Sequence, residues 1–169
     1  MRRQTHLAVG ALCAVQITTD LAPTVAVGAL ICCLAGAVVP DYLDLRSDFQ
    51  GLLRHRGISH SALAAVPATV AVYFIVDALS RVDLGEFSIS ASMIQRLWIA
   101  FAIGFASHLV LDACTTTCIR PALPCVGWRL CLLPRRLRIR TGGRVDAMIR
   151  WLAATAATIL LVGSLVRSL

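Results

Sequence analysis

Four long apolar stretches constrain this chain more than any other feature, because they set the solvent in which it can fold. They cover residues 21–39, 62–79, 97–113 and 151–166. A helix of about 20 residues, rising 1.5 Å per residue, crosses roughly 30 Å of hydrocarbon. Each stretch reaches or approaches that length, alone or with its flanks. The sequence therefore predicts an all-α fold, an integral membrane helical bundle.

A fifth apolar stretch, residues 7–18, is too short to span unless it is tilted or extended through its flanks. It either spans or forms half of a re-entrant hairpin that turns within residues 18–23, where Asp20 and Pro23 break the pattern. We therefore expect four to five transmembrane or re-entrant helices. A basic start and an apolar middle are also typical of a signal peptide, but there is no clean A-x-A cleavage site, so we expect the segment to be retained.

The composition agrees with lipid as the solvent. Of the 169 residues, 58% are hydrophobic, and the mean hydropathy is +0.79. Ordinary soluble domains contain about 45–50% apolar residues. The length suits one domain, so residues 1–169 are predicted to form a single membrane-embedded unit. All sixteen cationic residues are Arg, and neither Lys nor Asn occurs, which indicates a GC-rich bacterial genome and explains part of the Arg excess.

The distribution of Arg predicts the orientation in the membrane. If the apolar stretches cross in turn, thirteen of the sixteen Arg residues fall on the side that holds the N-terminus. The positive-inside rule makes that side cytoplasmic, so we expect a protein of the cytoplasmic membrane. All four His residues, His6, His55, His60 and His108, fall at ends of the stretches on this same side.

The strongest polar element is the pair His108 and Asp112, which are four residues apart and so share one face of a helix. Ionisable residues within an apolar stretch are costly and usually functional. The alternative is a His–Asp pair that only stabilises the bundle.

Two further carboxylates, Asp41 and Asp44, follow Pro40, which we expect to end the second apolar helix. Carboxylates at this spacing bind one cation or bridge two. The alternative is ordinary polarity at the end of a membrane span.

The segment "HRGISHS", residues 55–61, leads into the next apolar stretch. Gly57 permits a tight turn, and Ser59 is predicted to cap the helix that follows. His55 and His60 would then face the Asp pair, while Arg56 is free to hold an anion. The alternative is a basic loop at the lipid headgroups.

Together these residues predict a divalent metal site at the cytoplasmic face. The expected ligands are nitrogen and oxygen donors: His6, Asp41, His55, His60, His108 and Asp112. This donor set suits Zn²⁺ first, with Mn²⁺ or a mixed multinuclear site as alternatives. The expected catalytic residues are Asp41 or Asp44 as general base, and Arg56 on the substrate anion. Asp146 is expected to complement the dipole of a helix rather than to bind metal.

Two other features carry alternatives. Among seven Cys residues, Cys114 and Cys118 are four apart and would suit a soft metal, whereas disulfides are rare on the cytoplasmic side. Residues 119–140 combine Pro, Trp and Arg and are predicted to lie at the membrane interface, facing anionic lipid. Nucleic acid is not an expected partner, because no recognised binding fold surrounds the basic run.

The order of these motifs resembles the LexA-regulated membrane-bound metal-dependent hydrolase family. The likeness rests on "HRGISHS" (55–61) and "GFASHLVLD" (104–112), with His6 and the Pro40–Asp41 pair before them. It covers most of the chain and implies a metal-dependent hydrolase. A more distant likeness to zinc-dependent phospholipase C and P1-type nucleases implies phosphoester hydrolysis, by analogy.

The chain departs from that family's pattern at three places. One residue is inserted before Asp44 and no His follows it, Thr116 stands where the family has Pro, and Asp146 stands where the family tends to have Glu.

We therefore expect a membrane-bound metal-dependent hydrolase that cleaves a phosphoester or phospholipid with metal-activated water. The alternatives are a membrane protein with a structural metal site and a metal-ion transporter. A transporter would place its ligands near the bilayer midplane on broken helices, whereas these crowd one face. The sequence does not specify the oligomeric state.

Overall fold

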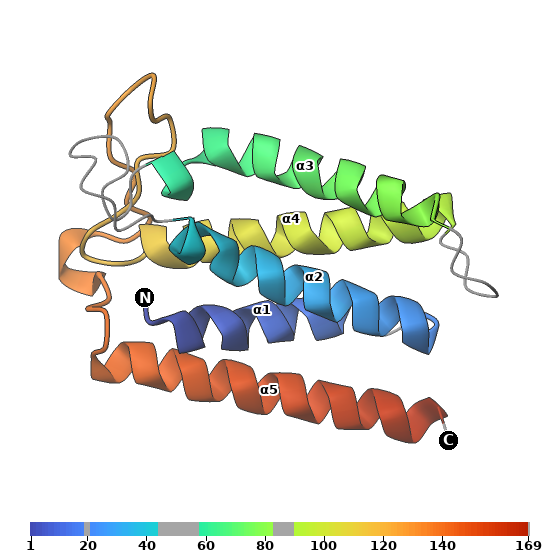
Figure 1. The fold of residues 1–169 in the computed structure, drawn as a ribbon. Coiled ribbons are helices and arrows are strands. Elements are labelled where there is room, and N and C mark those ends of the chain that lie inside the picture. The colour runs from blue at the N-terminus through green and yellow to red at the C-terminus, as the bar shows by residue number, and fades with distance from the viewer. Residues whose placement is uncertain (19–20, 44–57, 83–89, 169) are drawn as a thin grey trace.

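In the part of the chain that the structure describes, five α-helices run back and forth, side by side, so that successive helices are antiparallel (Figure 1). The computed structural model describes residues 1–18, 21–43, 58–82 and 90–168. The helices are α1 (Arg3–Thr18), α2 (Pro23–Tyr42), α3 (Ala62–Ser80), α4 (Ala91–Ala113) and α5 (Arg144–Ser168). In the described residues the rest is turns, two short 3₁₀ helices and isolated β-bridges. The fold is all-α, as predicted.

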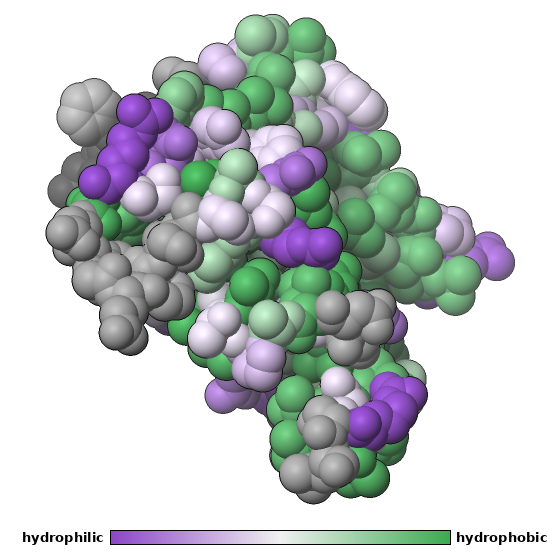
Figure 2. All heavy atoms as spheres, turned by 90° about the vertical axis from the view of Figure 1, so that its right-hand side faces the viewer, coloured by the Kyte–Doolittle hydropathy of each residue, from purple (hydrophilic) through white to green (hydrophobic). Residues whose placement is uncertain are grey.

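Four of these helices, α2 to α5, are long and apolar enough to cross a membrane. Their outward side chains are large and apolar; on α5, for example, Trp151, Ile159 and Val166 are each about two-thirds exposed. Figure 2 looks along the helices at the end of the bundle that holds the C-terminus and shows much apolar surface there, with hydrophilic residues in separate patches. Exposed apolar surface on this scale is stable in lipid, which confirms the predicted integral membrane bundle.

The first helix, α1, is one continuous element of 16 residues, about 24 Å long at 1.5 Å per residue. It contacts α2, α4 and α5, and its Ala14 and Val15 are buried. The first apolar stretch therefore folds as a full member of the bundle.

Close packing of α2 against α4 depends on two glycines. A Cβ added at Gly36 would collide with the Phe101 carbonyl. One added at Gly104 would lie 2.8 Å from the carbonyl carbon of Cys33 and 3.0 Å from the nitrogen of Ala37. Small residues let membrane helices approach closely. This approach brings the backbone of α2 to the polar end of α4.

Two predicted boundaries are wrong. Pro40 does not end its helix, because α2 continues to Tyr42. Ser59 is not the cap of α3: Ser61 accepts the Ala64 N–H at 3.0 Å and fills that role. Ser59 instead belongs to a 3₁₀ turn, Ile58–His60, and its hydroxyl lies 3.0 Å from Nδ1 of His60.

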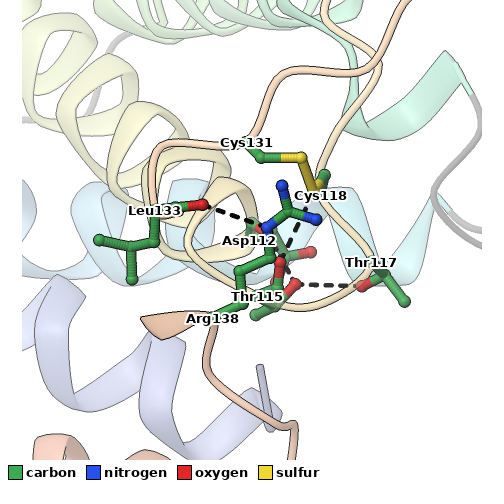
Figure 3. The surroundings of a disulfide bond; sticks show 7 residues. All are labelled: Asp112, Thr115, Thr117, Cys118, Cys131, Leu133 and Arg138. Atoms are coloured by element: carbon green, nitrogen blue, oxygen red, sulfur yellow. Dashed lines mark hydrogen bonds between the residues drawn. A yellow bond between two sulfur atoms is a disulfide. The ribbon is translucent and has the colours of Figure 1, made fainter. Parts of the chain in front are cut away.

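The segment between α4 and α5 folds over the same end of the bundle as the start of α3. A disulfide joins Cys118 to Cys131 (Figure 3). Ile119 pairs with Leu130 just inside it. The carbonyl of Pro121, within this closed loop, accepts hydrogen bonds from the first two N–H groups of α3. The loop thus holds the N-terminus of α3 in place, directly after His60.

Candidate metal centre

Four helix ends meet at one end of the bundle, and each brings an ionisable side chain (Figure 1). They are the N-termini of α1 and α3 and the C-termini of α2 and α4. The side chains are His6, Asp41, His60, His108 and Asp112. The structure brings these five side chains together in one cluster.

The distances between donor atoms suit a divalent cation. Nε2 of His60 lies 3.4 Å from Oδ1 of Asp41 and 3.7 Å from Oδ2 of Asp112. Nε2 of His108 lies 3.8 Å from each of the same two oxygens. Four ligands held tetrahedrally at about 2.1 Å from an ion are about 3.4 Å apart. The side chains therefore need to move only slightly to bind one.

Neighbouring groups orient two of these imidazoles. The carbonyl of Ala37 lies 2.7 Å from Nδ1 of His108, which fixes the Nδ1–H tautomer and aims Nε2 into the cluster. The Ser59 hydroxyl is 3.0 Å from Nδ1 of His60, and either group can be the donor. Metal-ligating His residues almost always have such a partner on the second ring nitrogen.

Burying these imidazole nitrogens costs free energy unless each finds a hydrogen-bond partner or a metal ion. His6 and His108 are fully buried. Neither ring nitrogen of His6, nor Nε2 of His108, has a hydrogen-bond partner among the described residues. Buried polar atoms are otherwise nearly always satisfied. A donor set of imidazole nitrogens and carboxylates, some of them unsatisfied, fits Zn²⁺ or Mn²⁺.

His6 has a distinct place in the cluster. Its ring stacks on that of His108, with centroids 3.8 Å apart and planes 19° apart. Its Nε2 lies 3.4 Å from Oδ1 of Asp112. The same oxygen accepts a hydrogen bond from the nitrogen of Met1 at 2.5 Å.

Asp146 lies apart from this cluster, in the first turn of α5. It accepts hydrogen bonds from the Thr5 hydroxyl and the Gly142 N–H, both at 2.6 Å, and from the Arg2 N–H at 3.3 Å. The hydrogen bond with Thr5 joins α5 to α1 at the residue before His6. The Thr5–Asp146 pair was not predicted, because nothing in the sequence except its position beside His6 sets Thr5 apart from other threonines.

Three predicted site residues, Asp44, His55 and Arg56, lie outside the described residues. Their expected roles stay predictions.

The cysteines do not form a soft-metal pair at this end. Cys118 is bonded to Cys131, so the alternative pairing of Cys114 with Cys118 as metal ligands is wrong for this structure (Figure 3). Cys114 is a free thiol, and burial raises its pKa above the ordinary value, which lowers its thiolate fraction.

Comparison with known families agrees with the membrane fold. The family model described as "YdjM inner membrane protein" matches residues 1–168, so the chain belongs to that family. The description names a location and no activity. No curated protein and no solved structure matches the chain.

Proposed function

We propose that this YdjM-family protein is a metal-dependent hydrolase that cleaves phosphoesters at the membrane surface. The observation that supports it most is the convergence of five ionisable side chains from the ends of four membrane-embedded segments. Such groups are expensive near lipid and usually mark a functional site. An ion bound there would act as a Lewis acid and lower the pKa of water.

The side chains of the cluster divide this work. His60, His108 and Asp112, which are almost fully buried, hold and orient the ion. The side chain of Asp41 is 16% exposed, more than its neighbours, and lies 3.4 Å from His60. It is therefore placed to accept a proton from water that enters the site, the role of a general base.

We further propose that this end of the bundle faces the cytoplasm. Most of the Arg residues flank the helix ends that carry the cluster, and Arg marks cytoplasmic loops. The Cys118–Cys131 disulfide lies at the same end and favours an oxidising compartment. We give the Arg distribution priority, because thirteen residues contribute to it and because the same two Cys residues form a dithiol under reducing conditions.

One observation favours a second candidate, a structural ion. Asp41 and Asp112 each place an oxygen 3.4–3.8 Å from Nε2 of both His60 and His108, and a site closed by four protein ligands is typical of structural zinc. A transporter fits less well, because the ligands lie at helix ends rather than on broken helices near mid-membrane.

The test compares wild type with His108→Ala and with Ser107→Ala, a neighbouring control whose hydroxyl donates to the Gly104 carbonyl of its own helix. Each protein is purified in detergent, its bound metals are measured, and it is assayed on soluble phosphomonoesters, phosphodiesters and phospholipid vesicles. We expect wild type and Ser107→Ala to bind Zn²⁺ or Mn²⁺ and to hydrolyse at least one class. His108→Ala should lose metal affinity by about 100-fold or more, since loss of even an outer-shell partner costs 10–100-fold.

Equal metal content in wild type and His108→Ala would overturn the metal site. Metal loss in His108→Ala, without turnover by wild type on any substrate, would support the structural ion instead. Hydrolysis that survives chelation would remove the metal from the mechanism.

A further inference from the structure

The segment that leads into α5 lies at the same end of the bundle as the N-terminus (Figure 1). Residues 136–145 of this segment line a cavity of about 700 Å³, called here the arginine cavity. None of its lining residues is acidic, and none belongs to the candidate metal centre. Four of them are arginines: Arg136, Arg138, Arg140 and Arg144. This concentration of positive charge therefore needs an explanation separate from the metal centre.

Local structure gives two of these arginines a defined place. Ile139 pairs with Thr115 in a β-bridge. Arg138 and Arg140 lie on either side of it in this extended stretch, so their side chains share one face. The side chain of Arg138 is half-buried, and its Nε donates to the carbonyl of Leu133 at 3.1 Å (Figure 3). A guanidinium has five N–H donors, and the other four of Arg138 have no partner among the described residues.

The charges of the arginine cavity are not neutralised by carboxylates. Among the described residues, no carboxylate forms an ion pair with any of the four arginines. The acidic residue closest in sequence, Asp146, is buried and accepts three hydrogen bonds, none of them from an arginine side chain. A fifth guanidinium lies beside the cavity, because a Cβ added at Gly142 would lie 3.0 Å from Nε of Arg2. Cations placed close together repel one another, so this arrangement favours a bound anion.

The arginine cavity also has an apolar wall. Leu137 and Val145 both line it, and they are 66% and 48% exposed. Val145 lies in the first turn of α5, a helix long and apolar enough to cross a membrane. Inorganic phosphate would need only the arginines, whereas a phospholipid needs cations for its headgroup and apolar surface at the membrane boundary. The combination favours a lipid over a free anion.

We propose that the arginine cavity binds the headgroup phosphate of one anionic phospholipid. Guanidinium groups match phosphate with paired hydrogen bonds, and basic pockets beside membrane helices bind anionic headgroups. The acyl chains of the same molecule lie along the outer face of α5, where Leu152 is 63% exposed. The sequence predicts only that residues 119–140 face anionic lipid, whereas the cavity defines a discrete site for one molecule.

The experiment uses the full chain in detergent and measures the stoichiometry and affinity of bound lipid by native mass spectrometry. The probes are phosphatidylglycerol, which is anionic, phosphatidylcholine with the same acyl chains, which is zwitterionic, and inorganic phosphate. A chelator is present throughout, so divalent cations contribute neither binding nor turnover.

Two double variants separate a discrete site from general attraction to a basic surface. Arg140→Gln/Arg144→Gln removes two cations from the cavity. Arg120→Gln/Arg129→Gln is the matched control, because it removes the same charge from exposed positions in the Cys118–Cys131 loop that do not line the cavity.

We expect wild type to bind one phosphatidylglycerol, at least about tenfold more tightly than phosphatidylcholine. An arginine near anionic lipid contributes about fivefold in affinity, so Arg140→Gln/Arg144→Gln should weaken phosphatidylglycerol binding by about 25-fold. The control variant should stay within about twofold of wild type, since exposed charges at a distance are screened. His108→Ala should bind the lipid as wild type does.

Equal weakening in the two double variants would overturn the site, because it would show diffuse attraction to the basic surface. Equal affinity for the two lipids would also overturn it. Displacement of phosphatidylglycerol by inorganic phosphate at the same concentration would assign the cavity to free phosphate instead. If the double variant does not fold, Arg140→Gln and Arg144→Gln are measured singly, each with an expected loss of about fivefold.

These outcomes are independent of the proposed function. A protein that binds this lipid but no metal keeps the lipid site and loses the hydrolase. Loss of lipid binding in His108→Ala would place the lipid at the metal centre and overturn the separate site.

Discussion

Replacing Thr5 with Val removes one hydrogen bond between α1 and α5 and changes little else. The Thr5 hydroxyl donates to Oδ1 of Asp146 at 2.6 Å, and both residues are about 1% exposed. Val is close to Thr in shape, so the cavity left behind is negligible. The cost is therefore that of the hydrogen bond itself, in a site from which water is excluded.

The structure sets the size of this cost. Hydrogen bonds to charged groups contribute about 1.5–3 kcal/mol, whereas hydrogen bonds between membrane helices average about 0.6 and reach about 1.7 kcal/mol. Asp146 also keeps its two backbone donors, Gly142 and Arg2, so its charge is not left unpaired. We expect Thr5→Val to lower the free energy of unfolding by about 1.5 kcal/mol, which is roughly tenfold in the unfolding equilibrium.

The assay is reversible unfolding in mixed detergent micelles, applied to Thr5→Val, Asp146→Asn and the double variant. A coupling energy of about 1 kcal/mol between the two positions is expected, since they are in contact. If Asp146 only complements the helix dipole, Asp146→Asn alone would cost about 0.3–1 kcal/mol. Thr5→Val would then stay within about 0.3 kcal/mol of wild type, and that result would refute the reasoning.

Two further predictions concern packing and orientation. Gly104→Ala should cost about 1–3 kcal/mol, because the added Cβ meets the backbone of α2 and forces the helices apart. Gly163→Ala on α5, where nothing lies within 4 Å of the added Cβ, should be neutral or stabilising by up to about 1 kcal/mol in the same unfolding assay. A membrane-impermeant maleimide should label the exposed Cys125 in opened membranes but not in intact cells, and labelling of intact cells would contradict the cytoplasmic orientation. In opened membranes at pH 7, Cys114 should react more slowly than Cys125, because burial raises the pKa of its thiol.

The membrane fold could be predicted because hydropathy is a property of long segments. The apolar stretches at 21–39 and 62–79 correspond to α2 and α3 within a few residues. The last stretch underestimates its helix: α5 begins at Arg144, seven residues before Trp151, since its first two turns carry charged side chains that hydropathy excludes.

Single residues that signal the start or end of a helix were less reliable predictors than hydropathy. Pro40 donates no hydrogen bond to the preceding turn and its ring crowds a carbonyl there, but α2 tolerates one such position in its last turn and continues to Tyr42. Two serines, Ser59 and Ser61, precede α3, and both are good caps. The N–H groups of Ala62 and Leu63 donate hydrogen bonds to the Pro121 carbonyl in the Cys118–Cys131 loop, and this contact with a distant part of the chain helps to fix where α3 begins.

Membership of the candidate metal centre could also be predicted, because alternating helices bring their odd and even ends to opposite sides. The starts of α1 and α3 and the ends of α2 and α4 lie on the same side, and these ends carry His6, Asp41, His60, His108 and Asp112. The arrangement of the individual side chains within this centre could not be predicted from the sequence. Which oxygen of Asp112 faces His6, and whether His6 stacks on His108 or converges with it, depends on ring orientations set by contacts across α1 and α4.

The energetics of the cluster explain why it stands out in a chain of this composition. An unsatisfied buried polar group costs about 1–3 kcal/mol, and His6 and His108 together present three ring nitrogens without a hydrogen-bond partner among the described residues. The polar network that supports them, from Ala37 to His108 and from Asp146 through Thr5 to the helix of His6, holds these nitrogens in the cluster instead of letting them turn away. A bundle that needed only stability would place apolar side chains here, because replacing buried charged groups by apolar ones is often neutral or stabilising. The proposed cation would account for this arrangement, since it would satisfy the nitrogens and offset the repulsion between Asp41 and Asp112 in one step.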